Sequence, residues 1–166
     1  MTQQDQKEQV RRILREAFSD WRADPDNPPL THHQCLDMRT KLLSVQKEDI
    51  DYFLPQVLED LLDTHTGSAE ISEDVESVVD FLDVPTISND GEVLKERLGR
   101  EGFEGVRSQE EELRSEKYSA VAHITSHQAS ALCEWLKYAR TWSDLEWNIE
   151  QVDSAYAYWN SRAQTT

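Results

Sequence analysis

The chain has 166 residues and a mass of 19.3 kDa, which suits a single domain with a substantial core. Its 33 acidic residues against 17 Lys and Arg give a formal net charge of −16. That charge argues against direct binding to nucleic acid or to an anionic membrane, because both would repel the protein, and it favours a basic partner. A hydrophobic content of 37% and five Trp residues argue against general disorder.

The apolar segments of the chain indicate the cellular compartment in which the protein is expected. No stretch approaches the roughly 20 apolar residues of a membrane-spanning helix, and the start, MTQQDQKEQV, lacks the apolar segment of a secretory signal. We therefore expect a cytoplasmic protein. Cys35 and Cys133 both fall in helical patterns, and we expect them to be reduced and partly buried.

Apolar residues recur at steps of three and four along nearly the whole chain, which predicts helices. The first helix is expected from about Gln4 to Trp21, followed by a proline-rich loop at residues 22–30. Thr31, with Gln34 three residues later, has the spacing of a capping box. A second helix is therefore predicted to begin there.

The middle of the chain is less regular. An apolar stripe from Ile50 to Leu62 predicts a helix, in which Pro55 should produce a kink or start a new helix. Ser72 is a suitable cap for the next helix. Residues 86–117 contain four of the five glycines, so we expect a short helix and then a mobile connection, with a charged helix beginning at Glu110.

Two further helices are expected at the C-terminal end. Thr125 with Gln128, and Ser143 with Glu146, repeat the capping-box spacing. No run of residues alternates with period two, and no internal repeat is visible. The sequence therefore predicts an all-α, single-domain bundle of five to seven helices that spans residues 1–166.

The negative charge is concentrated in the middle of the chain. Residues 48–92 contain fourteen acidic residues, and no Lys or Arg lies between Lys47 and Lys95. The apolar stripes should occupy the core-facing sides of these helices, so the carboxylates should lie on the outer sides. The candidate partner-binding carboxylates are Asp49, Glu59, Asp60, Asp63, Glu73, Glu76, Asp80 and Asp83. A docking surface, a solvated face that aids solubility and a divalent-cation site are the three interpretations.

Aromatic residues add a second candidate surface. Trp147 and Tyr158 are eleven residues apart, so they share one face of the last helix, opposite its apolar stripe. That face is either packed between other helices or exposed for binding, because Trp and Tyr are common in binding hot spots.

Catalytic and metal-binding motifs are weak. His32, His33 and Cys35 lie close together, and His123 and His127 are four residues apart, but CxxC and HExxH are absent. No Glu is followed by His three residues later, as a di-iron bundle would require, and there is no P-loop or GxSxG motif. The sequence therefore assigns no catalytic residue, metal ligand or cofactor.

Two segments carry a resemblance to known proteins. The pieces DYFLPQVLEDLLDTH and ITSHQASALCEWLKYARTW, with the later AYAYW, resemble an uncharacterised family of small acidic helical bacterial proteins. The matching positions are caps, core leucines and tryptophans, and they cover about half of the chain. In size, acidity and helicity the chain is also similar to immunity proteins that neutralise bacterial toxins.

These features lead to three hypotheses. The first is a non-catalytic immunity-type protein that binds a basic toxin or effector through the acidic surface. The second is a DNA mimic that occupies the nucleic-acid-binding groove of another protein. The third is a metal-dependent enzyme with Asp, Glu and His ligands.

Overall fold

The computed structural model describes residues 1–19, 26–64, 73–85, 91–142 and 148–165. Within these ranges, only the backbone is described for residues 73, 74, 91–103, 106 and 107. The described residues form seven α-helices and contain no strand, which confirms the predicted all-α class. The helices are α1 (Gln3–Ala17), α2 (His32–Met38), α3 (Ile50–Thr64), α4 (Glu73–Leu82), α5 (Gly91–Val121), α6 (Ser126–Ala139) and α7 (Ile149–Ala163), with short 3₁₀ helices η2 (Leu42–Ser44) and η3 (Lys47–Asp49).

Side-chain caps fix where several helices begin. Thr31 and Thr125 each form the predicted capping box, with Gln34 and Gln128 respectively, so α2 and α6 begin where the sequence indicates. A third capping box, which the sequence analysis missed, joins Thr2 to Asp5 at the start of α1. The expected caps Ser72 and Ser143 lie outside the described residues.

The first helix is shorter than predicted, because α1 ends at Ala17 and Phe18 forms its C-cap. Trp21 and residues 22–25 of the expected proline-rich loop lie outside the described residues, while residues 26–30 belong to no helix or strand, as expected for a loop. In α3, Pro55 is the sixth residue of a continuous helix and does not start a new one. Its missing N–H removes one backbone hydrogen bond, which the buried stripe of α3 outweighs.

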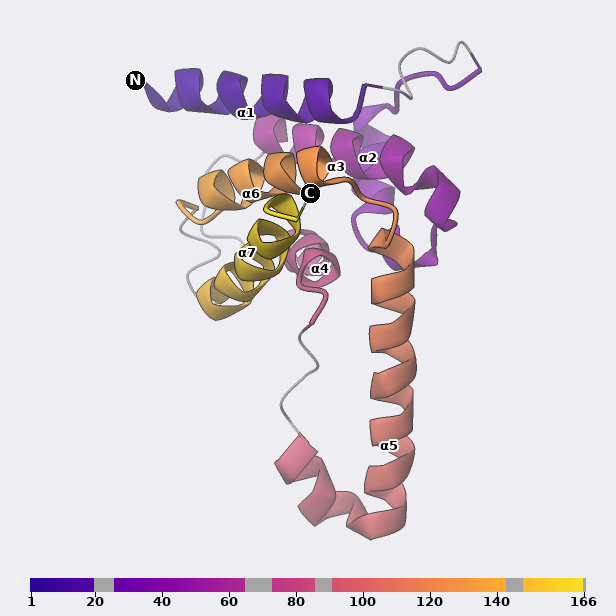
Figure 1. Ribbon diagram of the computed structural model, residues 1–166. Coiled ribbons are helices and arrows are strands. Elements are labelled where there is room, and N and C mark those ends of the chain that lie inside the picture. Colours follow the sequence, from indigo (N-terminus) through magenta and orange to yellow (C-terminus); the bar gives the residue numbers. More distant parts are fainter. Residues whose placement is uncertain (20–25, 65–72, 86–90, 143–147, 166) are drawn as a thin grey trace.

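Residues 91–121 form one helix, α5, where the sequence predicts a short helix, a connection and a second helix from Glu110. Figure 1 shows that its first turns bend relative to a longer straight part, which leads back to the other helices. The glycines of this segment each disfavour a helix by about 1 kcal/mol, but strong helix formers such as Glu, Arg, Lys and Gln occupy most other positions. Glu110 and Arg114, four residues apart, have a spacing that supports a helix.

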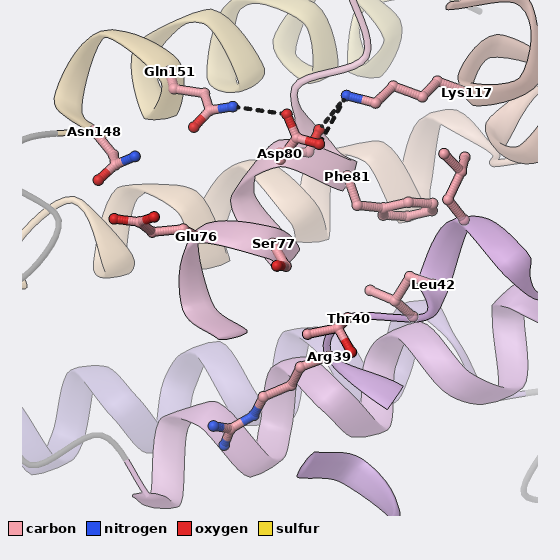
Figure 2. Close-up of a pocket in the computed structure, with 11 residues that line it drawn as sticks. Arg39, Thr40, Leu42, Glu76, Ser77, Asp80, Phe81, Lys117, Asn148 and Gln151 are labelled. Carbon is pink, nitrogen blue, oxygen red and sulfur yellow. Dashed lines mark hydrogen bonds and ion pairs between the residues drawn. The ribbon is translucent and has the colours of Figure 1, made fainter. Parts of the chain in front are cut away.

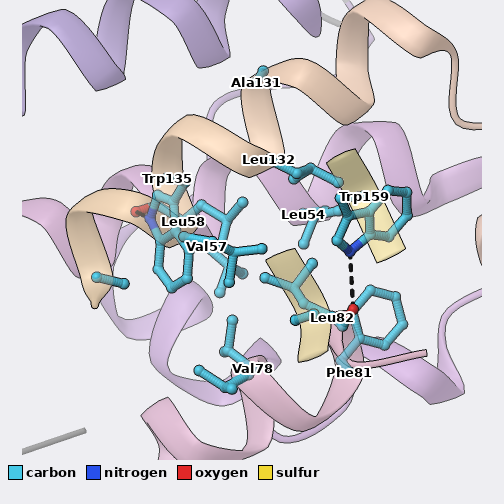
Figure 3. Packing of buried hydrophobic residues seen from close by; sticks show 14 of the residues in the cluster. Leu54, Val57, Leu58, Val78, Phe81, Leu82, Ala131, Leu132, Trp135 and Trp159 are labelled. Atoms are coloured by element: carbon cyan, nitrogen blue, oxygen red, sulfur yellow. Dashed lines mark hydrogen bonds between the residues drawn. The ribbon is translucent and has the colours of Figure 1, made fainter. Parts of the chain in front are cut away.

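The core lies where α3, α4, α6 and α7 meet (Figure 3). Helix α6 packs against α1 on one side and α7 on the other, while α3 contacts α1 and α2, and α4 contacts α7. The straight part of α5 leads away from this core, contacting η2 and η3 near its C-terminal end (Figure 1). Much of α5 is therefore an arm with little tertiary support.

Two tryptophans tie the helices together through hydrogen bonds as well as packing. Trp135 on α6 and Trp159 on α7 are both fully buried. The indole N–H of Trp135 donates to the Leu58 carbonyl of α3 at 3.1 Å, and that of Trp159 donates to the Leu82 carbonyl of α4 at 2.9 Å. Leu82 is the last residue of α4, where carbonyls have no partner within the helix, and Trp159 supplies a donor for it.

Replacing either tryptophan should destabilise the fold. In Trp159→Phe the buried Leu82 carbonyl loses its donor and the smaller ring leaves a void, so we expect a loss of about 2–4 kcal/mol in the free energy of unfolding. Trp135→Phe should cost less, because the Leu58 carbonyl lies inside α3 and can keep its intrahelical bond. Urea unfolding followed by far-UV circular dichroism measures both. As a control, Leu113→Ala on exposed α5 should change stability by less than about 0.5 kcal/mol.

Candidate functional site

The carboxylates of α3 meet cations from α1, which is distant in sequence. Asp63 pairs with Arg11 and lies 3.4 Å from the Lys7 ammonium, and Glu59 lies 2.9 Å from the Arg15 guanidinium. The hydrogen bond that Arg15 donates to Glu59 raises the pKa of the Arg15 guanidinium. The charges that α3 gathers on its outer side are thus balanced by one face of α1.

The pair formed by Asp60 is the most buried of the described ion pairs. Asp60 accepts a hydrogen bond from Arg39 at 3.1 Å, and their side chains are 13% and 6% exposed. The same Arg39 nitrogen donates to the Thr64 hydroxyl at 2.8 Å, and His32 Nδ1 lies 2.8 Å from the other Asp60 oxygen. Asp60 is therefore a structural charge, held between α2 and the C-terminal part of α3.

On α4 the predicted carboxylates differ from one another. The buried Lys117 of α5 donates to the Asp80 carbonyl at 2.7 Å and lies 3.3 Å from its carboxylate, which also accepts from Gln151. Asp83 is fully buried, with one oxygen accepting from Ser154 and the other without a partner. Glu76 is half-buried and has no ion pair or hydrogen bond with any described residue.

The expected uncompensated acidic surface is therefore not found on α3 or on the described part of α4. Glu59, Asp60, Asp63 and Asp80 are balanced individually, and Asp83 lies in the interior. The physical reason is that tertiary packing brings the cations of α1, α2 and α5 to these helices. The side chain of Glu73 lies outside the described residues.

Other exposed carboxylates lie on η3 and α5, two elements that contact each other. Glu48 and Asp49 of η3 are exposed, and Glu112 and Glu116 are exposed on α5, which contacts η3. None of the four forms an ion pair with a described residue. We call these four residues the acidic face. The sequence analysis included Asp49 but not Glu112 or Glu116, because it sought the acidic surface within residues 48–92, where no Lys or Arg interrupts the carboxylates.

A shallow groove of about 410 Å³ adjoins the acidic face. Glu116 lines it from α5, and the cation Lys47 lines it from η3. The other lining residues are small or apolar, and they are Leu43, Val45, Ser115, Ser119 and Ala120.

On the other side of η2 lies a larger pocket of about 550 Å³, which we call the central pocket (Figure 2). Residues from η2, α4, the C-terminal part of α5 and the start of α7 line it, together with Arg39 and Thr40. Leu42 and Phe81 form an apolar wall, while Glu76, Asp80 and Asn148 contribute polar groups. No sequence motif indicated this pocket, because its residues come from four separate segments.

The aromatic surface has one described member. Tyr158 is half-buried, and its ring packs edge-to-face against Tyr118 of α5, with centroids 5.9 Å apart. The guanidinium of Arg162 lies 6.0 Å from the Tyr158 centroid and donates to the carbonyls that end α5. Tyr158 thus joins α7 to α5. Trp147 lies outside the described residues.

The described residues contain no group of three or more His, Cys, Asp or Glu side chains that could hold a metal ion. Cys35 and Cys133 are buried and free. Burial raises the pKa of each thiol to about 11. The Cys35 thiol donates to the Gln56 carbonyl at 3.7 Å, so it serves in packing between α2 and α3.

Comparisons with protein-family models, with curated proteins and with solved structures give no match for this chain. Among the described residues, no helix has the length and apolar character needed to cross a membrane.

Removing one partner of the buried ion pair should be costly. Asp60→Asn leaves the Arg39 guanidinium buried without its counter-charge, so we expect the free energy of unfolding to fall by about 3 kcal/mol. Asp153→Asn is the matched control, because the Asp153–Arg140 pair is about half exposed on both sides and should contribute less than about 1 kcal/mol. Equal losses in urea unfolding would contradict the structural role of Asp60.

The thiols provide a pH-dependent prediction. A rise in thiol pKa from 9.0 to about 11 lowers the thiolate fraction at pH 8 about 100-fold, so native protein should react very slowly with a thiol reagent such as dithionitrobenzoate. Protein unfolded in guanidinium should react at both cysteines at an ordinary rate. Because each thiol ionises near pH 9 in the unfolded chain and near pH 11 in the folded one, burial of the protonated thiols stabilises the fold fully below about pH 9. This contribution to the free energy of unfolding is lost as the pH rises through 11. Rapid labelling of the native protein would contradict the described burial.

Proposed function

We propose that this chain is a non-catalytic protein that binds a basic protein partner and neutralises it, as immunity proteins neutralise bacterial toxins. The acidic face, Glu48, Asp49, Glu112 and Glu116, is the proposed first point of contact. Its supporting observation is that these carboxylates are exposed and unpaired among the described residues, while Glu59, Asp60 and Asp63 of α3 are balanced within the fold.

The charge of the whole chain supports this proposal. A net charge of −16 creates a long-range attraction for a basic protein, and such steering raises association rates by 10 to 1,000-fold at low salt. Cations of α1 and the Arg39 that follows α2 form ion pairs with carboxylates of α3. The unpaired negative charge therefore lies on other parts of the surface. An arm such as α5, with exposed Leu113 and Tyr118 beside its carboxylates, offers apolar contacts to the same partner.

The proposal can be tested on a partner captured from an extract of the source organism by the immobilised chain. The double variant Glu48→Lys/Asp49→Lys should slow association with that partner at least about tenfold in 50 mM salt, because it reverses the local potential. Raising the salt to 300 mM should slow the wild-type association by a similar factor. Biolayer interferometry measures both rates.

The matched control is Glu8→Lys/Glu16→Lys on α1, which changes the net charge by the same amount at another place. It should slow association much less than the η3 double variant. If the two variants slow association equally, or if salt has no effect, the acidic face is not the contact surface.

A further inference from the structure

The central pocket contains one carboxylate more than its cations balance. Arg39 lines the pocket, but its guanidinium is paired with Asp60 on α3. Lys117 also lines the pocket and is paired with Asp80. The other carboxylate of the pocket, Glu76, is half-buried and has no ion pair with a described residue. A carboxylate in such a position gains most from a ligand that carries a single positive charge.

A second, independent feature of the pocket is a buried acceptor without a donor. Asn148 is the N-cap residue of α7, a position where Asn side chains usually accept a backbone N–H, but its side chain makes no such bond. Its Oδ1 atom is buried and has no hydrogen-bond partner among the residues that the structure describes. Figure 2 shows the side chains of Asn148 and Glu76 on the same side of the pocket, one from α7 and one from α4. Both residues line the central pocket, and each carries an acceptor for N–H groups.

The rest of the pocket suits an apolar stem. Phe81 and Leu42 are buried side chains that line it, and an aromatic ring can also contact a cation favourably. The volume of about 550 Å³ lies within the range of small-ligand pockets. The pocket therefore combines a surplus negative charge, an unsatisfied acceptor and an apolar wall.

We propose that the central pocket binds a ligand with one ammonium or guanidinium group on an apolar stem, its charged nitrogen bound by Glu76 and Asn148. The same chemistry is found in a free alkylamine and in a Lys or Arg side chain that another protein inserts. The pocket does not depend on the acidic face, so this proposal stands or falls separately from the proposed function.

The test is an NMR titration of the full chain with n-butylamine and with N-acetyl-arginine amide, both of which carry one positive charge. We expect saturable shifts of the side-chain amide signals of Asn148 and Gln151, which both line the pocket. N-acetyl-norleucine amide, which has a similar stem without the charge, should leave these signals unchanged. Glu76→Gln should weaken binding of the charged probes at least about tenfold.

The matched control is Glu150→Gln, which removes an exposed carboxylate from the first turn of α7 that does not line the pocket. It should bind the probes as the wild type does, and circular dichroism checks that both variants are folded. A capped nonapeptide with one central Arg distinguishes the two sources. Tighter binding of the peptide than of the free probes supports an inserted side chain, and weaker binding supports a free amine. Equal binding of the uncharged probe, or unchanged binding in Glu76→Gln, overturns the proposal.

Discussion

The balance of charge between α3 and its neighbours is the constraint on which the arrangement of the N-terminal half depends. A helix that presents Glu59, Asp60 and Asp63 on one side cannot pack against another helix unless that helix brings cations. Helix α1 brings Lys7, Arg11 and Arg15, and α2 is followed by Arg39. The apolar stripe of α1 and its basic residues thus act together, and both direct α1 onto α3 and α6.

This pairing also decides where the net charge of −16 can act. Carboxylates that are balanced within the fold contribute little to the field that a distant partner experiences, because each forms a local dipole with its cation. The field at the surface is therefore shaped by exposed carboxylates without such partners, as at η3 and α5. The net charge of the sequence therefore differs from the unpaired charge on the surface, and binding depends on the unpaired surface charge.

Features within a single helix could be predicted from the sequence, whereas contacts between residues far apart in the chain could not. The caps Thr31 and Thr125 and the buried stripe of α3 follow from spacing within one helix, so the sequence indicates them directly. The ion pairs of Glu59, Asp60, Asp63 and Asp80 join residues 21–56 positions apart, and nothing in a local pattern reveals which residues meet. The complete burial of Trp135 is not evident from a local pattern for a related reason. Helix α6 packs between α1 and α7, so it buries more than the single stripe that a surface helix would show.

The carboxylates of α4 have regular helical spacing, yet they differ in whether the fold supplies them with a cation. Asp80 and Glu76 are one helical turn apart, and spacing alone would make them equivalent. Lys117 reaches Asp80 from α5 and is itself buried, so that pair belongs to the fold. Glu76 lines the central pocket and has no ion pair with a described residue. Two other residues that line the pocket carry buried atoms without a hydrogen-bond partner among the described residues, the acceptor Oδ1 of Asn148 and the donor Nε of Arg39. Asp60 and Asp80 receive their cations from within the fold, whereas Glu76 has no cation among the described residues, which is the property expected of a binding residue.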